Sequence, residues 1–322
     1  MTFNTWHAGK EVNNGTSKLN KEIELSKADV VLLQEMTNCE LFNLPDFDKD
    51  WKIASNGDCS TNIILTKFPI VQMLTNETEP LYRRAEVGVK VQISGSPLRY
   101  MTFWNVHLPY KNYGPYRLCE QNSSFSDDIY GTYAGDDLES VQRSEYFLEN
   151  YEDPATKTIK KSGRYSEILQ LWDYNPFYYS LLGTKDIPMV VGGDFNAPSH
   201  LDWTLDARPL HCDKKFDWPI SRHMMNHGFV DTFRQIHPDP IKDPGHTWSP
   251  IQQKRNYPDS VMPEGKEPQD RIDFIYFKGG FYDKILDSRT VASGHNKPYN
   301  EGHETNDWPS DHKAVVSVFE IA

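Results

Sequence analysis

Cysteine is scarce in this sequence, and long apolar runs are absent from it. The 322 residues hold four cysteines, none in a Cys-x-x-Cys pair, so a disulfide-stapled scaffold and a thiolate zinc site are both disfavoured. Two alternatives stay open: a bridge between Cys39 and Cys59, or four free, buried thiols that include Cys119 and Cys212. No apolar run reaches about 18 residues, which excludes a membrane-spanning helix.

A signal-peptide pattern is also missing, because no basic segment followed by an apolar one opens the chain. Residues 1–6 already have the pattern of a strand. This start favours a mature or trimmed chain, with a genuine short N-terminus as the alternative.

Basic residues are outnumbered: 34 Lys and Arg face 46 Asp and Glu, a formal net charge of −12. Non-specific affinity for nucleic acid comes from clustered Lys and Arg, so the charge argues against wholesale coating of a polyanion. A phosphate substrate is not excluded, because a divalent cation held by carboxylates reverses the local field.

Strand-like and helix-like segments alternate along the chain, and polar or acidic residues stand at the ends of five strands. This pattern predicts an α/β fold: a four-layer α/β/β/α sandwich of two packed mixed β-sheets flanked by helices. We expect helices over residues 18–27, with Leu19, Ile23 and Leu25 inward, and over 163–182. The expected strands cover residues 1–6, 28–35, 60–70, 85–93, 98–108, 186–196, 271–277 and 312–321.

One domain is expected over residues 1–322, because no linker divides the chain. An insertion at about 110–163 interrupts the alternation of strands and helices. Its first part is rich in Tyr, Gly and Asp and has no clear hydrophobic period. Such a segment either forms a wall of the active site or is a surface loop without a role in function. A second irregular stretch, residues 236–270, is a candidate rim of the site.

Single residues at the strand ends are weak signals. Glu35 follows an apolar run, and Asp194 and Asn196 follow another in GGDFN, where the two glycines allow close backbone approach. In isolation Glu35 reads as a surface residue and the Asp-x-Asn pair as a turn after a strand. His107, which ends the run LRYMTFWNVHL, reads by itself as a structural histidine.

The set is more informative than its members. Asn4 lies in the first strand, Asp273 starts the strand RIDFIYF, and Asp311 and His312 precede the last one. In order, TFNTW, VVLLQE, NVHL, GGDFN, RIDF and SDHKAV resemble the motifs of the endonuclease/exonuclease/phosphatase (deoxyribonuclease I-like) superfamily. The resemblance runs from Asn4 to Ile321 and implies a metal-dependent phosphoester hydrolase.

The resemblance implies a cation site and a reacting site. Glu35 is then the main Mg²⁺ ligand, with Mn²⁺ or Ca²⁺ as alternatives, and Asn4 and Asp311 assist it. Oxygen ligands of this kind suit Mg²⁺.

The same resemblance gives roles to five further residues. Asp194 activates the attacking water and Asn196 holds that water or a phosphoryl oxygen. His312, kept protonated by Asp273, stabilises the phosphoryl group, and His107 contacts its opposite side or assists the leaving group. Further substrate contacts are expected from Arg84, Asn62, Trp248 and Trp308.

The substrate is less well defined. Asn196-Ala-Pro and Gln269-Asp-Arg depart from the inositol polyphosphate phosphatase pattern, and the acidic balance speaks against abasic-site endonucleases. GDFNAPSHLDWT and PGHTWSP resemble a poorly characterised, often secreted bacterial branch. We expect a phosphodiesterase acting on a small or carbohydrate-like phosphoester, in a secreted or periplasmic protein, with a cytoplasmic location left open.

Three alternatives to this function are kept: a DNA or RNA nuclease, a sphingomyelinase-like lipid phosphodiesterase, and a binding module that has lost catalysis. Several aromatic side chains could stack on sugar or base rings, or simply pack the insertion: Tyr110, Tyr113, Tyr116, Tyr130, Tyr133, Trp172, Trp203 and Trp248. Because aromatic rings serve both purposes, the sequence leaves this choice open.

Overall fold

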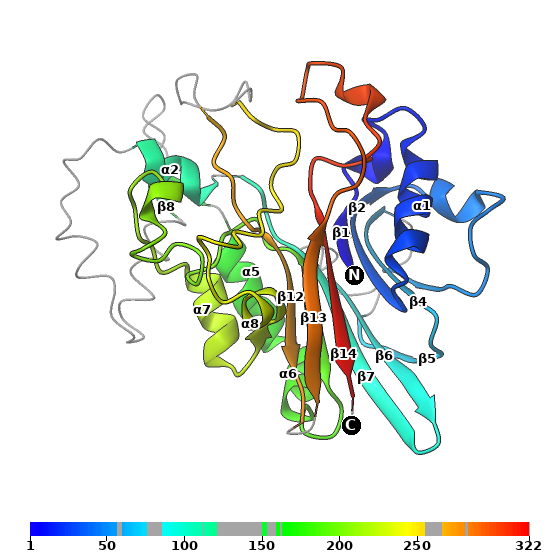
Figure 1. Ribbon diagram of the computed structural model, residues 1–322. Coiled ribbons are helices and arrows are strands. Elements are labelled where there is room, and N and C mark those ends of the chain that lie inside the picture. Colours follow the sequence, from blue (N-terminus) through cyan, green and yellow to red (C-terminus); the bar gives the residue numbers. More distant parts are fainter. Residues whose placement is uncertain are drawn as a thin grey trace.

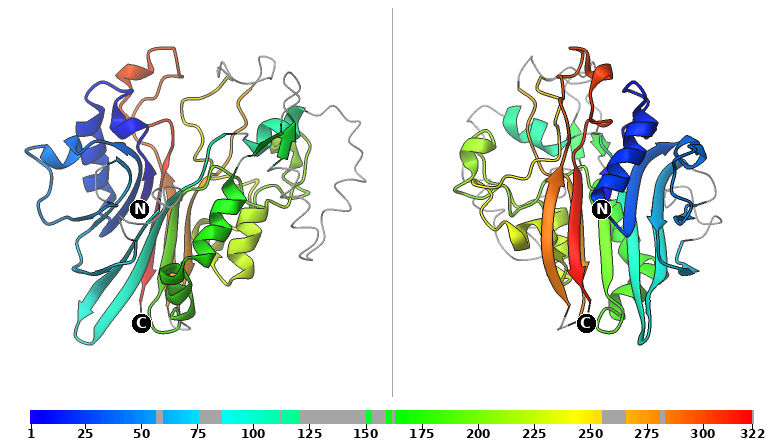
Figure 2. Two further views of the ribbon diagram at one scale, coloured as in Figure 1. Left: turned by 180° about the vertical axis from the view of Figure 1, so that it is seen from behind. Right: turned by 45° about the vertical axis from the view of Figure 1, so that its right-hand side comes forward.

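Two six-stranded mixed sheets pack against each other in the computed structural model, with helices on their outer faces (Figures 1 and 2). The predicted four-layer sandwich is thereby confirmed. The structure describes residues 1–56, 60–75, 86–111, 113–120, 150–152, 159–161, 163–254, 266–280 and 283–321.

The first sheet has the strand order β13-β14-β1-β2-β4-β3. Its central pair β1/β2 is parallel, and its other pairs are antiparallel. The strands are β1 (Thr2–Asn4), β2 (Val30–Thr37), β3 (Lys52–Ala54), β4 (Ser60–Thr66), β13 (Lys284–Val291) and β14 (Ala314–Glu320).

The second sheet has the order β11-β12-β10-β7-β6-β5, and its parallel pair is β10/β7. A separate antiparallel pair joins β8 (Asn150–Glu152) to β9 (Ile159–Lys161). The strands of the sheet are β5 (Ile70–Met73), β6 (Val87–Gly95), β7 (Leu98–His107), β10 (Met189–Asp194), β11 (Val230–Asp231) and β12 (Asp273–Lys278).

Strand β2 shows how the layers form, since successive side chains of a strand point to opposite faces. Val30 and Leu32 pack between the two sheets, whereas Val31 and Leu33 pack on the side of helix α1. Both faces of β2 are covered, which explains its continuous apolar run.

Helices cover the outer face of each sheet (Figure 1). Leu19 and Ile23 of α1 are buried as predicted, but Leu25 is 58% exposed. The expectation for Leu25 was wrong, because a residue two positions beyond Ile23 lies on the opposite side of a helix. The α-helices are α1 (Gly15–Ser26), α2 (Gly114–Glu120), α5 (Arg164–Asp173), α6 (Asn175–Leu182), α7 (Pro219–Asn226) and α8 (Thr232–Ile236).

Short 3₁₀ turns complete the described elements: η1 (His7–Gly9), η2 (Glu40–Asn43), η4 (Arg208–Leu210) and η5 (His303–Thr305). None of the helices that the structure describes has the length and apolar character needed to cross a membrane.

A disulfide ties the insertion to a later segment of the chain. Cys119, in α2, is bonded to Cys212, 93 residues further along the chain. Cys39 is also disulfide-bonded, so the alternative of four free thiols was wrong. Much of the insertion, including Tyr130 and Tyr133, lies outside the described residues.

Candidate active site

Six chain segments bring polar residues to the same end of the two sheets. Asn4 ends β1, and His107 and Asp194 end the parallel strands β7 and β10, where they are register partners. Asp273 begins β12 and is the register partner of Asp194, because β12 runs antiparallel to β10. His312 stands just before β14, which runs antiparallel to β1. Strand direction therefore explains why residues distant in sequence meet.

Glu35 reaches this end through a β-bulge in β2. Leu33 pairs with Ile63, and Met36 pairs with Thr61, so two residues of β2 face one residue of β4. Glu35 has φ 57°, a left-handed conformation that costs energy in a residue with a side chain. A bulge changes the direction of a side chain, so Glu35 does not follow the alternation of β2 side chains between the two faces of the sheet.

The amide of Asn4 joins two carboxylates. Its Nδ2 donates to Glu35 Oε1 at 3.2 Å and to Asp194 Oδ2 at 2.9 Å, while its Oδ1 accepts from the backbone N–H of Trp6 at 3.1 Å. Asn4 is fully buried, so its orientation is fixed. Burial raises the pKa of Glu35, but the imidazoles of His107 and His312 and the Asn4 amide outweigh it and hold that pKa below its ordinary value.

Asp194 lies at the centre of the cluster and is 1% exposed. Its Oδ1 accepts from the backbone N–H of Asn196 at 2.8 Å, and its Oδ2 lies 3.6 Å from His107 Nε2 and 3.8 Å from His312 Nε2. Burial, followed by the Asp273 carboxylate, raises the pKa of Asp194 to about 6. This pKa suits a group that accepts a proton near neutral pH.

The predicted role of the glycine pair before Asp194 is confirmed for Gly193. Its φ is +148°, and a Cβ atom at this position would lie 1.8 Å from the carbonyl oxygen of Val106. Only glycine allows β10 to approach β7 so closely at this point.

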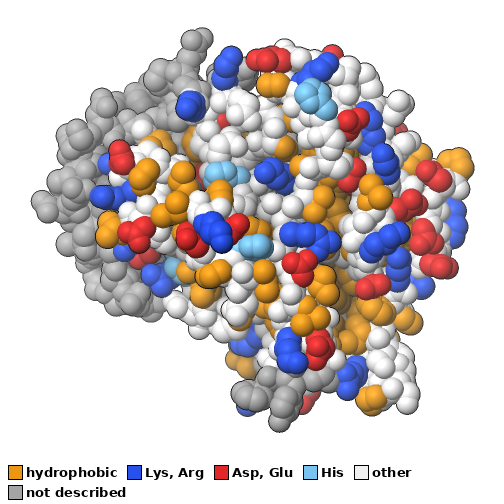
Figure 3. Space-filling view, in the orientation of Figure 1, with side chains coloured by type: hydrophobic (Ala, Val, Ile, Leu, Met, Phe, Trp, Pro, Cys, Tyr) orange, Lys and Arg blue, Asp and Glu red, His pale blue; other side chains and the backbone are white. Residues whose placement is uncertain are grey.

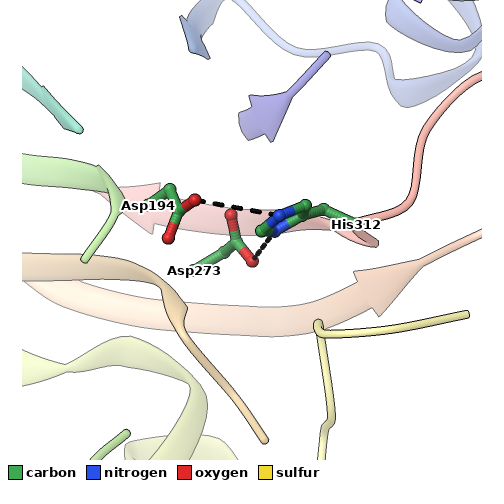
Figure 4. Close-up of side chains that lie close together, drawn as sticks. All are labelled: Asp194, Asp273 and His312. Carbon is green, nitrogen blue, oxygen red and sulfur yellow. Dashed lines mark hydrogen bonds and ion pairs between the residues drawn. The ribbon is translucent and has the colours of Figure 1, made fainter. Parts of the chain in front are cut away.

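His312 is held by Asp273, as Figure 4 shows. Its Nδ1 lies 2.9 Å from Asp273 Oδ2, and both side chains are buried. Burial lowers the pKa of His312, but the carboxylates of Asp273 and Asp194 outweigh it and raise that pKa well above its ordinary value. A buried imidazolium at this position can stabilise negative charge on a bound phosphoryl group.

The segment before His312 is fixed by hydroxyl and indole groups. Ser310 Oγ donates to the carbonyl of Asn4 and accepts from the N–H of His312, at 2.7 and 3.0 Å. Trp308 is fully buried against Phe3, and its Nε1 donates to the His312 carbonyl at 2.6 Å. This side chain therefore supports the backbone of His312 from the core, and the role of Trp308 as a substrate contact stays a prediction.

The other expected substrate contacts have different outcomes. Trp248 packs its ring 4.9 Å from that of His312, and Asn62 is buried in β4 opposite the bulge. Their roles as substrate contacts stay predictions. Arg84 lies outside the described residues.

Two groupings could attract a cation. Among the described residues, Asp194, Asp273 and His312 place ligand-type atoms within 4.8 Å of one another, but both nitrogens of His312 already face carboxylates. Burial raises the pKa of Asp311 to about 7; His312 opposes this, and the Glu35 carboxylate adds to it. The Glu35 and Asp311 carboxylates thus repel each other, and oxygen ligands of this type suit a hard divalent cation.

Three supporting features were missed from the sequence. His7 donates its backbone N–H to Glu35 Oε2 at 3.3 Å, and Thr247 Oγ1 accepts the N–H of Asp273 at 3.1 Å. Gln34 Nε2 donates across the sheets to Asn105 Oδ1 at 2.6 Å. Only the position of Gln34 beside Glu35 could have indicated such a contact.

A second group of buried acids anchors aromatic side chains next to the site. Asp270 accepts from Trp203 Nε1 at 2.8 Å and from the Tyr113 hydroxyl at 2.9 Å, and Glu267 accepts from Trp248 Nε1 at 3.0 Å. Trp203 and Tyr113 are buried, so the packing alternative is confirmed for these two rings.

Asp270→Asn is expected to weaken the pH dependence of stability. Burial raises the pKa of Asp270 to about 7, so its contribution is fully present below the unfolded-state pKa and is lost as pH rises through 7. As pH rises from 5 to 8, the unfolding free energy of the parent should fall by about 2 to 3 kcal/mol relative to that of the variant. Urea denaturation of both proteins at pH 5 and pH 8 measures these free energies. The same difference between parent and variant at both pH values would contradict the prediction.

Comparison with known proteins agrees with this geometry. The sequence profile of the Endonuclease/Exonuclease/phosphatase family matches residues 1–312, so the chain belongs to this family of phosphoester hydrolases. Its members are generally dependent on divalent metal ions.

Individual relatives cover nearly the whole chain. An uncharacterized protein of Caenorhabditis elegans is 32% identical over 99% of this chain and 90% of its own length. The fold is similar to that of the 3′ phosphatase NExo from Neisseria (TM-score 0.53, 16% identity, 99% of this chain and 98% of that one). It is also similar to D. rerio TDP2 complexed with a single-strand DNA product (TM-score 0.50, 13% identity, 99% and 98%).

Proposed function

We propose that the protein is a divalent-metal-dependent phosphodiesterase that hydrolyses a small or carbohydrate-like phosphoester. The observation that carries this proposal is the Asn4 amide, which bridges Glu35 Oε1 and Asp194 Oδ2 at 3.2 and 2.9 Å. It places a carboxylate suited to a cation beside a carboxylate suited to a base, within reach of one phosphoryl group.

Glu35 and Asp311 would hold the cation, which would neutralise charge on the phosphoryl oxygens, and Asn4 would assist by orienting the Glu35 carboxylate through its Nδ2 at 3.2 Å. The chain's own groups then perform the hydrolysis. Asp194 accepts a proton from water as the water oxygen bonds to phosphorus, and the bond from phosphorus to the leaving oxygen breaks. The imidazolium of His312, oriented by Asp273, stabilises the phosphoryl oxygens.

Two further residues complete the proposed arrangement. Asn196 is held by its Nδ2, which donates to the carbonyl of Leu108 at 2.9 Å, and it orients the attacking water or a phosphoryl oxygen. His107 Nε2 lies 3.6 Å from Asp194 and 3.8 Å from Glu35, on the side away from β12, and supports the leaving oxygen.

A small substrate is favoured over nucleic acid by the distribution of charge. In the view of Figure 3, Lys and Arg side chains are interspersed with Asp and Glu, and the described part of this face carries no continuous basic band. The net charge of −12 supports the same choice, since nucleic-acid binding depends on clustered basic residues.

Hydrolysis of bis-p-nitrophenyl phosphate tests the proposal. Turnover is expected with Mg²⁺ or Mn²⁺, loss of turnover with EDTA, and recovery when the metal ion is restored. The monoester p-nitrophenyl phosphate and a supercoiled plasmid serve as comparisons. Faster turnover of the monoester would make the protein a phosphatase, plasmid nicking a nuclease, and no turnover of any ester would leave a binding module.

A further inference from the structure

The turn after β1 holds an exposed histidine over Glu35. Trp6, His7 and Ala8 have φ values of 47°, 57° and 60°, so three consecutive residues with side chains adopt the left-handed conformation. Residues other than glycine rarely adopt it, and such strain gathers at functional sites. The turn brings His7 Nε2 to 3.8 Å from Glu35 Oε2, the oxygen that also accepts the His7 backbone N–H.

A second carboxylate orients this imidazole. Glu11 Oε1 lies 3.0 Å from His7 Nδ1, and an ionised carboxylate only accepts hydrogen bonds. Nδ1 therefore carries the proton of the neutral ring, which leaves a lone pair on Nε2. A carboxylate–histidine pair that presents Nε2 in this way is the usual support of a metal-binding histidine.

The two oxygens of Glu35 have different neighbours. Oε1 faces the interior, with Asn4 Nδ2 at 3.2 Å and His107 Nε2 at 3.8 Å. Oε2 faces His7, whose side chain is 55% exposed. In the neutral ring protonated at Nδ1, the lone pair of His7 Nε2 and the outer oxygen of Glu35 are two acceptors 3.8 Å apart.

We propose that His7 Nε2 and Glu35 Oε2 are joint donors to one divalent ion, and that Glu11 is a positioning residue for His7. Metal–nitrogen and metal–oxygen bonds of about 2.0 to 2.2 Å let one ion reach two donors that lie 3.8 Å apart. Imidazole favours first-row transition metals over Mg²⁺, which prefers oxygen ligands. His7 consequently favours a transition-metal ion over Mg²⁺ at Glu35. This inference rests on the proposed function, because it concerns the same cation site.

Isothermal titration of the metal-free protein with Zn²⁺ and with Mg²⁺ tests the proposal. His7→Ala and His7→Asn should each weaken Zn²⁺ binding about tenfold or more and leave Mg²⁺ binding within about threefold. Asn tolerates the left-handed conformation, so His7→Asn preserves the turn while its side chain is too short to reach the ion. Glu11→Ala should cause a smaller loss for Zn²⁺ only. Replacement of the exposed His295 by alanine is the control and should change neither affinity.

The Co²⁺ form provides a spectroscopic measurement, because loss of a nitrogen ligand shifts its visible absorption in His7→Ala. Unchanged Zn²⁺ affinity in both His7 variants, or equal losses for Zn²⁺ and Mg²⁺, would overturn the assignment. If the parent protein binds Mg²⁺ and hydrolyses phosphoesters under those outcomes, only this inference fails. If the parent binds neither ion and turns over no ester, the proposed function fails with it.

Discussion

His312→Ala and Asp194→Ala are each expected to lower kcat by about a hundredfold or more, on the order of 3 kcal/mol of transition-state stabilisation. The His312 imidazolium is fixed by Asp273 at 2.9 Å and is buried, so no water can replace its charge without rearrangement. Asp194 Oδ2 lies 3.6 Å from His107 Nε2 and 3.8 Å from His312 Nε2, and loss of this carboxylate removes the proposed base. Steady-state kinetics with the best ester of the panel measures both effects.

Folding must be separated from chemistry in these variants. Asp194→Asn keeps the size of the side chain and is expected to lose turnover to a similar extent, with a circular dichroism spectrum like that of the parent. His295→Ala, an exposed histidine, should keep full activity. A folded His312 or Asp194 variant with near-parental kcat on the true substrate would remove that residue from the proposed mechanism.

Arg271→Met is expected to cost about 3 to 5 kcal/mol of unfolding free energy, since it leaves the buried Asp231 carboxylate without a cation, whereas Asp202 keeps its ion pair with Arg234 at 2.6 Å. Arg271 is 1% exposed and contacts two buried carboxylates. Its NH1 and NH2 donate to Asp231 at 2.8 and 2.7 Å, and its Nε and NH2 donate to Asp202 at 3.2 and 3.0 Å. Turnover should fall as well, because Arg271 lies two residues before Asp273.

Urea denaturation at pH 7 measures the loss of stability. Arg289→Met is the matched control: Arg289 pairs with Asp287 at the surface, where both side chains are more than 40% exposed. Such exposed pairs contribute about 0 to 1 kcal/mol. An Arg271 variant no less stable than the control would show that the two carboxylates take up protons or water at little cost.

Much of the site could be predicted because its residues stand at strand ends. Apolar runs fixed the positions of β2, β7 and β10, and parallel neighbours that end together bring their last residues to one edge. The strand β13 was missed for the opposite reason. Its residues Lys284–Val291 lie on an edge strand and, apart from Ser288, are exposed or half-buried, so no apolar pattern marks them.

Other features depend on geometry that residue types do not encode. The bulge at Gln34 and Glu35 arises because β2 has two residues, and β4 only one, between the pairs Leu33/Ile63 and Met36/Thr61. The predicted helix over residues 163–182 is divided after Asp173, and a second helix begins at Asn175 with Pro176 in its first turn. The partner of Cys119 could not be chosen, because disulfide connectivity follows the fold rather than the spacing. The single-domain organisation stays a prediction.

The bond between Cys119 and Cys212 also bears on how the protein should be handled at the bench. Dithiothreitol, a routine component of nuclease and phosphatase buffers, would open the covalent link between α2 and the segment after η4. Bacterial expression in a reducing cytosol would yield a chain in which that link never formed. Activities recorded with and without thiol reductant would then describe two chemically different proteins, and only the oxidised one corresponds to the structure.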